Sequence, residues 1–246
     1  MIKICLVVPC YNESKRLKPQ SFIDFANETG IHLVFVNDGS SDNTFEIIDE
    51  IAKSAPELIK AVSTPQNMGK AEAVRYGVNL VMGQANSYDF IGFYDSDQAT
   101  PLNEVLNTRD YLLENPHFKM IMGMRLKRLG TKVNRDLKRH YLGRIFATFV
   151  SLTLNLPTYD TQCGYKLIHT SLVKEIFQKP FVSKWFFDVE LLFRIRNWKG
   201  SQFVKESVYE FPLFEWEEVE GSKIKLIDYF TVPFELLKIR SKYGRG

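Results

Sequence analysis

The sequence predicts an α/β fold in which helices flank a mostly parallel central sheet. Over the first 125 residues, short apolar segments alternate with segments of helical periodicity, and this alternation is typical of βαβ units. Two of the predicted strands, 32–37 and 89–95, also lead into acidic residues. Open α/β sheets bind ligands at the carboxyl ends of their strands, so we expect the functional site at that edge.

The elements of the first half follow in a regular order. The predicted strands are residues 2–8, 32–37, 59–62, 89–95 and 119–123. Helix start and stop signals place helices from about 22 to Gly30, from a cap at Ser41 or Asp42 to 51, from Lys70 to Gly83, and from 102, just after Pro101, to 114.

Beyond residue 125 the pattern changes. Residues 134–156 are predicted to be helical, basic at the front and apolar at the back. A predicted helix at 187–197, a predicted strand at 202–212 and an apolar, basic segment at 222–240 follow. The regular alternation of strands and helices therefore ends near residue 125.

Composition limits the class of protein. The 246 residues are 45% hydrophobic and 25% charged, as in ordinary globular proteins. Three cysteines, at 5, 10 and 163, do not make a disulfide framework, so we expect a reduced, cytosolic protein.

The strand-like segment from residue 2 argues against a signal peptide. The longest charge-free apolar run, 145–157, is shorter than the about 20 residues that span a bilayer, so we expect a soluble or peripheral protein.

The charge of the chain is unevenly distributed. The formal net charge is +3, but eight basic residues and one acid lie between Arg125 and Arg144. This segment therefore carries +7, and the rest of the chain carries −4. Such an asymmetry indicates an anionic partner on one face.

Carboxylates follow two of the predicted strands. Asp95 and Asp97 come after the apolar run 90–94, and Asp38 comes after the strand 32–37. Carboxylates at a strand end could hold a hard divalent cation, and such a cation could hold a diphosphate. A D-x-D sequence alone often only caps a helix or a turn. Two strands that bring acids to the same edge suggest a nucleotide-plus-metal site.

Glycine-rich phosphate motifs are mostly absent. No G-x-G-x-x-G follows the first strand, which disfavours a dinucleotide-binding Rossmann enzyme, and the P-loop sequence is also missing. The segment Asn67–Lys70 is the nearest to a phosphate loop. Gly69 would let the backbone approach a ligand, and Lys70 could neutralise a phosphate at a helix N-terminus. The same segment also fits an ordinary loop-to-helix junction.

Taken in order, four motifs resemble the nucleotide-sugar domain of family 2 glycosyltransferases, which has the GT-A fold. They are Val8–Glu13, Val36–Asp42, Asn67–Lys70 and Asp95–Asp97. The resemblance implies roles for several residues in binding the nucleotide-sugar donor. It implies that the base and ribose are cradled by Pro9, Tyr11, Glu13 and Asp38. It also implies that Lys70 and Asp95 help hold the nucleotide, and that Mg²⁺ or Mn²⁺ binds at Asp97 with Asp95.

Three further motifs look like those of polyprenyl-phosphate glycosyltransferases, nearest to the dolichyl-phosphate β-glucosyltransferase type. They are Asp160–Leu167, Trp185–Leu192 and Trp216–Lys223. The segment Gln98–Thr100 after Asp97 resembles that branch more than the mannosyl branch. The resemblance covers nearly the whole chain. Eukaryotic glucosyl enzymes of this type carry an N-terminal membrane anchor, whereas here a strand is predicted from residue 2. We therefore expect either that membrane recruitment comes from elsewhere or that the acceptor differs.

The resemblance implies an inverting, metal-dependent transfer of a hexose to a polyprenyl phosphate, dolichyl or undecaprenyl, at the cytoplasmic face of a membrane. The hexose is expected to be glucose from UDP-glucose. The catalytic domain would be residues 1–212, with a nucleotide-sugar half (1–125) and an acceptor half (126–212). Residues 213–246 would form an amphipathic, basic appendage.

The chemistry agrees with this expectation. A phosphate monoester has a second pKa near 6, so it is largely dianionic at neutral pH and can attack the anomeric carbon without a strong general base. The difficult part is the departing nucleoside diphosphate, whose charge the metal would neutralise. A single displacement inverts the anomeric configuration.

Arginines are the candidates for binding the acceptor phosphate, because the guanidinium offers a planar fork of donors. Arg125 is favoured because it follows a strand end near the expected metal, and Arg144, Arg139 and Arg135 are further candidates. Each of them could instead be a solvated surface charge. Asp160 is expected near the reacting centre, where it would orient the acceptor or position a basic residue, or else it caps the turn before Gly164. The expected catalytic residues are therefore Asp97, Asp160 and Arg125.

The basic and apolar stretch 134–156 has two interpretations. It could be a core helix that packs on the sheet. It could instead lie in a membrane interface, with Ile145, Phe146, Phe149 and Leu152 in the lipid boundary and the basic residues against headgroups. We favour partial interfacial contact.

Several alternatives remain at this point. The first is the same fold acting as a polyprenyl-phosphate mannosyltransferase with GDP-mannose, or as a family 2 transferase with a non-lipid acceptor. The second is a nucleic-acid-binding module that uses the basic segment, which lacks interleaved aromatic residues apart from Tyr141. The third is a non-catalytic sugar-nucleotide sensor, although all the acids of the expected site are present.

Overall fold

The computed structural model describes residues 2–83, 88–134, 137–219 and 228–244. The chain divides into two compact units. Unit 1 consists of Met1–Gln98 and Gly164–Pro180, and unit 2 of Ala99–Cys163 and Phe181–Gly246. These bounds differ from the divisions expected at 125 and 212, which stay predictions about function.

Unit 1 is built on a sheet with the strand order β3-β2-β1-β4-β7. Its strands are β1 (Ile4–Cys10), β2 (His32–Asn37), β3 (Ile59–Ser63), β4 (Phe90–Tyr94) and β7 (Tyr165–His169). Its helices are α1 (Pro19–Thr29), α2 (Thr44–Ser54), α3 (Lys70–Met82) and α6 (Thr170–Ile176). All neighbouring strands pair in parallel except β4 and β7, which are antiparallel. The prediction of an α/β fold with a mostly parallel sheet is confirmed.

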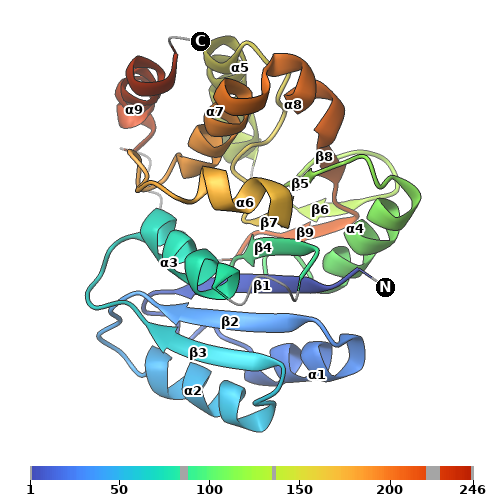
Figure 1. Cartoon of the computed structure of the whole chain (residues 1–246), viewed down its shortest axis with the longest axis vertical. Helices are drawn as coiled ribbons and strands as arrows, with labels where there is room; N and C mark the ends of the chain where they lie inside the picture. The colour runs from blue at the N-terminus through green and yellow to red at the C-terminus, as the bar shows by residue number, and fades with distance from the viewer. Residues whose placement is uncertain (1, 84–87, 135–136, 220–227, 245–246) are drawn as a thin grey trace. The chain divides into compact units, whose positions relative to one another are not determined.

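Helices cover both faces of the unit 1 sheet (Figure 1). Phe22 of α1 packs edge-on against Phe35 of β2 and Tyr94 of β4. Gly77 of α3 lies against Val7 and Val36, which point to the opposite face, and a Cβ atom at Gly77 would overlap both valines. The five residues of β4 are all buried. Strands buried on both faces read as continuous apolar runs, which explains why these segments were recognisable in the sequence.

Unit 2 contains two pairs of parallel strands and five helices among its described residues. The strand pairs are β5 (Met120–Met124) with β8 (Val208–Pro212), and β6 (Lys132–Asn134) with β9 (Glu215–Glu217). The helices are α4 (Asn103–Glu114), α5 (Leu137–Leu154), α7 (Phe187–Lys199), α8 (Ser201–Ser207) and α9 (Asp228–Tyr243). Helix α5 contacts α7 and α9, and α7 also contacts α8 and α9.

Most predicted elements are present, and one was wrong. The predicted strand 202–212 is a strand only over β8, because its first part forms α8. Val204 and Ser207, three residues apart, are the buried positions of α8, which is helical spacing. The short strands β6 and β9, the strand β7 and the helix α6 were not predicted. The predicted helix over 134–156 is confirmed as α5.

Candidate functional site

The strand order of unit 1 reverses at β1. The chain builds outward from β1 to β2 and β3 on one side and then places β4 on the other side of β1. Ligands of open α/β sheets bind outside the carboxyl ends of the strands at such a reversal. The segments that leave β1, β2 and β4 begin at Tyr11, Asp38 and Asp95. The structure therefore brings the predicted donor-site acids of unit 1 to one edge of the sheet.

Asp38 fastens the loop before α3. Its side chain is buried, with 2% exposed, and it accepts hydrogen bonds from the backbone N–H groups of Met68 and Gly69, both at 2.8 Å. The hydroxyl of Thr64 donates a third bond at 3.1 Å. Gly39 permits this arrangement, because its φ is +65° and a Cβ atom there would lie 2.6 Å from the Asn67 nitrogen. Asp38 thus acts through the loop that carries Lys70.

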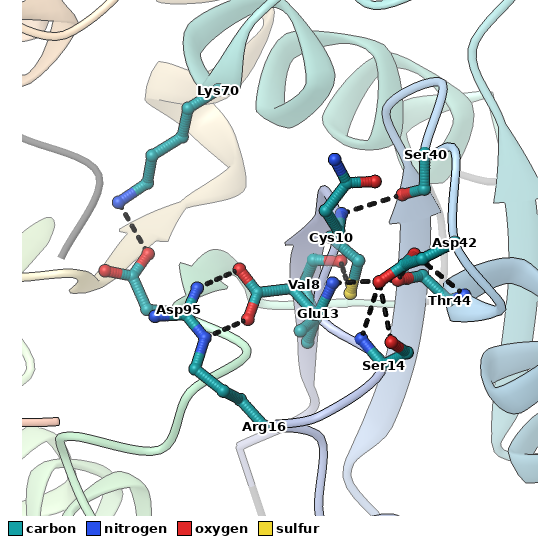
Figure 2. A network of polar contacts seen from close by, with 11 residues as sticks. Val8, Cys10, Glu13, Ser14, Arg16, Ser40, Asp42, Thr44, Lys70 and Asp95 are labelled. Atoms are coloured by element: carbon teal, nitrogen blue, oxygen red, sulfur yellow. Dashed lines mark hydrogen bonds and ion pairs between the residues drawn. The ribbon is translucent and has the colours of Figure 1, made fainter. Parts of the chain in front are cut away.

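Lys70 and Asp95 form an ion pair across the site. Lys70 is the first residue of α3, and its Nζ lies 2.5 Å from Oδ1 of Asp95, which follows β4 (Figure 2). The backbone N–H of Asp95 donates to the Gly164 carbonyl at 2.9 Å. A Cβ atom at Gly164 would overlap the Asp95 carboxylate, so only glycine leaves room for it. The sequence predicted both charged residues but not the glycine that supports them.

The turn after Asp95 carries Asp97. Gln98 follows it with φ +55°, a left-handed conformation that is uncommon for a residue with a side chain. The Gln98 amide donates to the Ser21 hydroxyl at 2.7 Å, and the hydroxyl is 3.0 Å from the amide oxygen. This contact ties the acidic turn to α1 within unit 1. The role of Ser21 was not predicted, since its partner lies 77 residues away.

The donor set fits a cation that is shared with a ligand. Within the described part of the chain, no group of three or more His, Cys, Asp or Glu side chains could hold a metal ion by itself. Magnesium is usually bound by one or two carboxylates together with substrate phosphates. Asp97 with Asp95 supplies such a set, because both carboxylates are only half-buried. The residues present therefore fit a divalent cation that a diphosphate helps to bind.

The segment after β1 is tied to the segment after β2. Asn12, with φ +50°, donates its N–H to the Ser40 hydroxyl at 3.0 Å and accepts from the Ser41 N–H at 2.9 Å. Glu13 is buried and forms two bonds with the Arg16 guanidinium, of 2.8 and 2.5 Å (Figure 2). Two further residues were predicted to bind the nucleotide-sugar donor. Pro9 is half-buried within β1, and Tyr11 is exposed just after the end of β1. Contact of these residues with a base or ribose stays a prediction.

Asp42 anchors the same pair of loops. Partial burial would raise the pKa of its carboxyl, but hydrogen bonds from Thr44 and Ser14 outweigh that effect and lower the pKa from 3.8 to about 2. The bonds from the Ser14 hydroxyl and the Thr44 hydroxyl are 2.7 and 2.5 Å long. Asp42 also accepts from the Thr44 N–H at 3.1 Å. The N-cap position of α2 is Asn43, whose side chain forms no cap hydrogen bond, so the cap predicted at Ser41 or Asp42 was wrong.

Unit 2 contains a second ion pair of predicted residues. Arg125, just after β5, donates from Nε and Nη2 to the two carboxylate oxygens of Asp160, each at 2.7 Å, and its backbone N–H donates at 3.1 Å. The guanidinium also lies over the Trp216 ring, 5.3 Å from its centroid. Of the alternatives for Asp160, the geometry favours positioning a basic residue. Asp160 also accepts from the Gln162 N–H at 3.3 Å.

Glu210 of β8 holds the segment around Asp160. Its carboxylate accepts from the backbone N–H groups of Tyr159 and Asp160, with bonds between 2.7 and 2.9 Å. Sequence reasoning missed this residue, because its partners lie about fifty positions away in the chain and no local motif marks it. The Asp160 carboxylate is therefore fixed through its backbone as well as through Arg125.

Of the other arginines predicted to bind the acceptor phosphate, Arg144 has a described side chain and Arg135 and Arg139 do not. Arg144 of α5 stacks on the Tyr159 ring, with Cζ 3.8 Å from the centroid. Arg135 lies outside the described residues, and so does the side chain of Arg139, although its backbone belongs to α5. Arg125 and Arg144 both approach the Tyr159–Asp160 segment within unit 2.

The apolar face predicted for α5 is partly correct. Ile145, Phe149 and Leu152 are exposed, by 55%, 52% and 72%. Phe146 is buried and packs on Phe186 at 5.3 Å between ring centroids, so the expectation that it enters lipid was wrong: it faces the core of unit 2. None of the described helices is long and apolar enough to cross a membrane.

The comparisons with known proteins agree with this geometry. A family model described as glycosyl transferase family 2 matches residues 5–177. A dolichyl-phosphate beta-glucosyltransferase of Trichomonas vaginalis is 30% identical over 98% of this chain and 74% of its own length. One from Saccharomyces cerevisiae is 30% identical over 100% of this chain and 76% of its own length.

A solved structure shares the fold at lower identity. Glucosyl-3-phosphoglycerate synthase of Mycobacterium tuberculosis, crystallised with Mn²⁺, UDP and glucosyl-3-phosphoglycerate, superposes with a TM-score of 0.66 at 18% identity. The match covers 99% of this chain and 80% of that one. The predicted GT-A fold is confirmed.

Proposed function

The chain belongs to glycosyl transferase family 2 and is a hexosyltransferase, and we propose that it transfers glucose from UDP-glucose to a polyprenyl phosphate in a metal-dependent reaction. The acceptor is a dolichyl or undecaprenyl phosphate at the cytoplasmic face of a membrane. The observation that carries the proposal is the convergence of Asp38, Lys70 and Asp95 at one strand edge. The relatives named dolichyl-phosphate beta-glucosyltransferases support the choice of sugar and acceptor, because they align with almost the entire chain.

Unit 1 supplies the donor site in this proposal. Asp97 and Asp95 hold Mg²⁺ or Mn²⁺ together with the diphosphate. The cation supplies charge neutralisation as the diphosphate leaves. Lys70 adds a second positive charge at the N-terminus of α3, where backbone N–H groups also favour an anion. Pro9, Tyr11, Glu13 and Asp38 shape the base and ribose site.

Unit 2 supplies the acceptor site in this proposal. Arg125 binds the acceptor phosphate, and Asp160 orients the guanidinium by its two hydrogen bonds. Arg144 adds a second guanidinium. Arg139 remains a predicted contributor from a part of α5 whose side chains are not described. The bound phosphate dianion attacks the anomeric carbon as the diphosphate departs on the opposite face, which inverts the configuration.

Membrane contact is proposed for α5 and α9. The exposed side chains of α5 are joined by Phe234 and Leu237 of α9, which are 74% and 60% exposed. The two helices contact each other within unit 2. Lys238, Arg240 and Lys242 follow on α9. Apolar side chains beside basic ones are what an interfacial helix presents to an anionic lipid surface.

A donor and acceptor panel tests the proposed function. Purified protein is incubated with Mn²⁺, one of several nucleotide sugars and one of several acceptors: a short polyprenyl phosphate, the matching alcohol or a free sugar. We expect lipid-linked glucose only with UDP-glucose and the polyprenyl phosphate, and no product after chelation. Equal transfer to the alcohol or to a sugar hydroxyl would contradict the lipid-phosphate acceptor. Faster transfer from GDP-mannose would identify the mannosyl alternative.

A further inference from the structure

The Lys70–Asp95 ion pair supports an inference about how the donor is bound, and it rests on the proposed function. We propose that this ion pair is exchanged when the donor binds. The cation takes the Asp95 carboxylate and the diphosphate takes the Lys70 ammonium group. Cation and nucleotide then bind cooperatively, and the cation alone binds weakly.

Both members of the pair have the charge that one part of the donor complex requires. A divalent cation seeks a carboxylate, and a diphosphate seeks an ammonium group. In the structure these two groups neutralise each other, with Nζ and Oδ1 2.5 Å apart. A cation that arrives alone therefore meets an acid whose charge is already compensated. A diphosphate that arrives alone meets a lysine whose positive charge is compensated in the same way by Asp95.

The two side chains remain accessible to a ligand. The Lys70 side chain is 27% exposed and that of Asp95 is 36% exposed. Two other acids of the site are buried and already form hydrogen bonds, which a ligand would have to break. Asp38 is buried and accepts two backbone N–H groups, and Glu13 is buried against Arg16. The Lys70–Asp95 pair can therefore open without unfolding a loop.

The geometry indicates which partner moves. The Asp95 carboxylate lies against the backbone at Gly164, where a Cβ atom would overlap it, and the Asp95 N–H is bonded to the Gly164 carbonyl. The backbone of Lys70 is fixed as well, because Asp38 holds the preceding N–H of Gly69. The four-carbon side chain of Lys70 has more rotatable bonds than the short side chain of Asp95, so it is the partner whose charged end can move. Opening the pair therefore moves Nζ and leaves the carboxylate in place for the cation.

The size of the coupling follows from the exposure of the pair. Partly exposed ion pairs contribute about 1 kcal/mol or less, which corresponds to about a fivefold change in a binding constant. Removing the Lys70 side chain leaves the Asp95 carboxylate available to the cation. It also removes the positive ammonium group that would repel the incoming cation. Because coupling between two ligands is reciprocal, the same change weakens the effect of the nucleotide on cation affinity.

Direct measurement of Mn²⁺ binding tests this inference. Free Mn²⁺ is measured by electron paramagnetic resonance during titration of the whole protein, with and without UDP. We compare the natural protein with Lys70→Met and with the control Lys53→Met. Lys53 forms a 2.5 Å pair with Asp49 on α2, and neither residue belongs to the four donor motifs.

In the natural protein and in the control we expect UDP to tighten Mn²⁺ binding. In Lys70→Met we expect Mn²⁺ without UDP to bind about two- to fivefold tighter, and UDP to tighten Mn²⁺ binding by a smaller factor than in the natural protein. Asp95→Asn should bind Mn²⁺ weakly with or without UDP. Circular dichroism checks that the variants fold.

Two outcomes separate this inference from the proposed function. If the natural protein transfers glucose and shows cooperative binding, but Lys70→Met binds Mn²⁺ alone no tighter, the exchange is wrong and the function stands. If the natural protein neither transfers glucose nor binds Mn²⁺ in the presence of UDP, both are wrong.

Discussion

The Asp160 carboxylate binds the Arg125 guanidinium through two hydrogen bonds of 2.7 Å, from Nε and from Nη2. The side chains are 7% and 15% exposed, and the Trp216 ring covers the guanidinium. This arrangement fixes both the position and the plane of the guanidinium. In the proposed reaction it presents the remaining donors of Arg125 to the acceptor phosphate.

Replacing Asp160 should affect the acceptor more than the donor. Asp160→Asn loses one charged acceptor and leaves Arg125 without its ionic partner, so we expect the KM for polyprenyl phosphate to rise about tenfold. The KM for the donor should change little. The free energy of unfolding should fall by about 3 kcal/mol, as for other buried pairs that lose one member. Initial rates at varied acceptor and a urea titration measure the two effects.

A matched control uses an exposed ion pair of the same unit. Asp110 lies 3.3 Å from Arg109 and is 66% exposed, so Asp110→Asn should leave both measurements unchanged. An Asp160→Asn enzyme with an unchanged KM for the acceptor would contradict the positioning role.

Gly164 should be intolerant of even a methyl group. In Gly164→Ala the new Cβ overlaps the Asp95 carboxylate, so the carboxylate must move away from Lys70 and from the expected cation. We expect UDP affinity in the presence of Mn²⁺ to fall at least tenfold, an estimate based on loss of a charge-assisted contact. Isothermal titration calorimetry measures it.

Gly83→Ala is the control for this substitution. The nearest atoms to a Cβ at Gly83 are 3.4 Å away or more, which is ordinary contact. Equal UDP affinity in the two alanine variants would show that Asp95 does not need its present position.

Asp42 should make the stability of unit 1 depend on acidic pH. Its folded-state pKa of about 2 lies below the ordinary value of 3.8. The carboxylate therefore contributes stability above pH 3.8, and this contribution is lost as the pH falls through about 2. In Asp42→Asn we expect a lower urea midpoint at pH 6 and a smaller loss between pH 4 and pH 2. Parallel slopes for both proteins would contradict the assignment.

The exposed apolar residues of α5 should contribute to membrane binding. We expect Phe149→Ser with Leu152→Ser to weaken binding to vesicles that contain anionic lipid by about tenfold or more, from the loss of buried apolar area. Flotation assays measure it. Leu113→Ser is the control, because Leu113 is 56% exposed on α4. Loss of binding in the control to the same extent would argue against a specific face.

The sequence was most informative where structure is local. Buried strands such as 90–94 are continuous apolar runs, and the acids that follow them lie at a strand edge because parallel strands share their direction. For the same reason Asp38 and Asp95 could be assigned to one site. The helix start at Lys70 was also visible, because Gly69 precedes it.

Contacts between distant segments could not be predicted in the same way. Arg125 and Asp160 are 35 residues apart, and Glu210 is a further fifty from Asp160. Gly164 reaches Asp95 only because β7 joins the sheet antiparallel to β4, and nothing near Gly164 in the sequence indicates that pairing. The period of α5 did not show that Phe146 turns inward while Phe149 stays outside.

The most direct test of the proposed mechanism is the rate of glucosyl transfer by Asp97→Asn as a function of Mn²⁺. Asp24→Asn serves as control, since Asp24 is an exposed residue of α1 that accepts a bond from Gln20. We expect the Asp97 variant to lose about a thousandfold in rate at saturating donor and acceptor, with a weaker response to Mn²⁺ and an unchanged melting temperature. Transfer at the natural rate, with the natural Mn²⁺ dependence, would contradict the claim that this acid holds a cation against the leaving diphosphate.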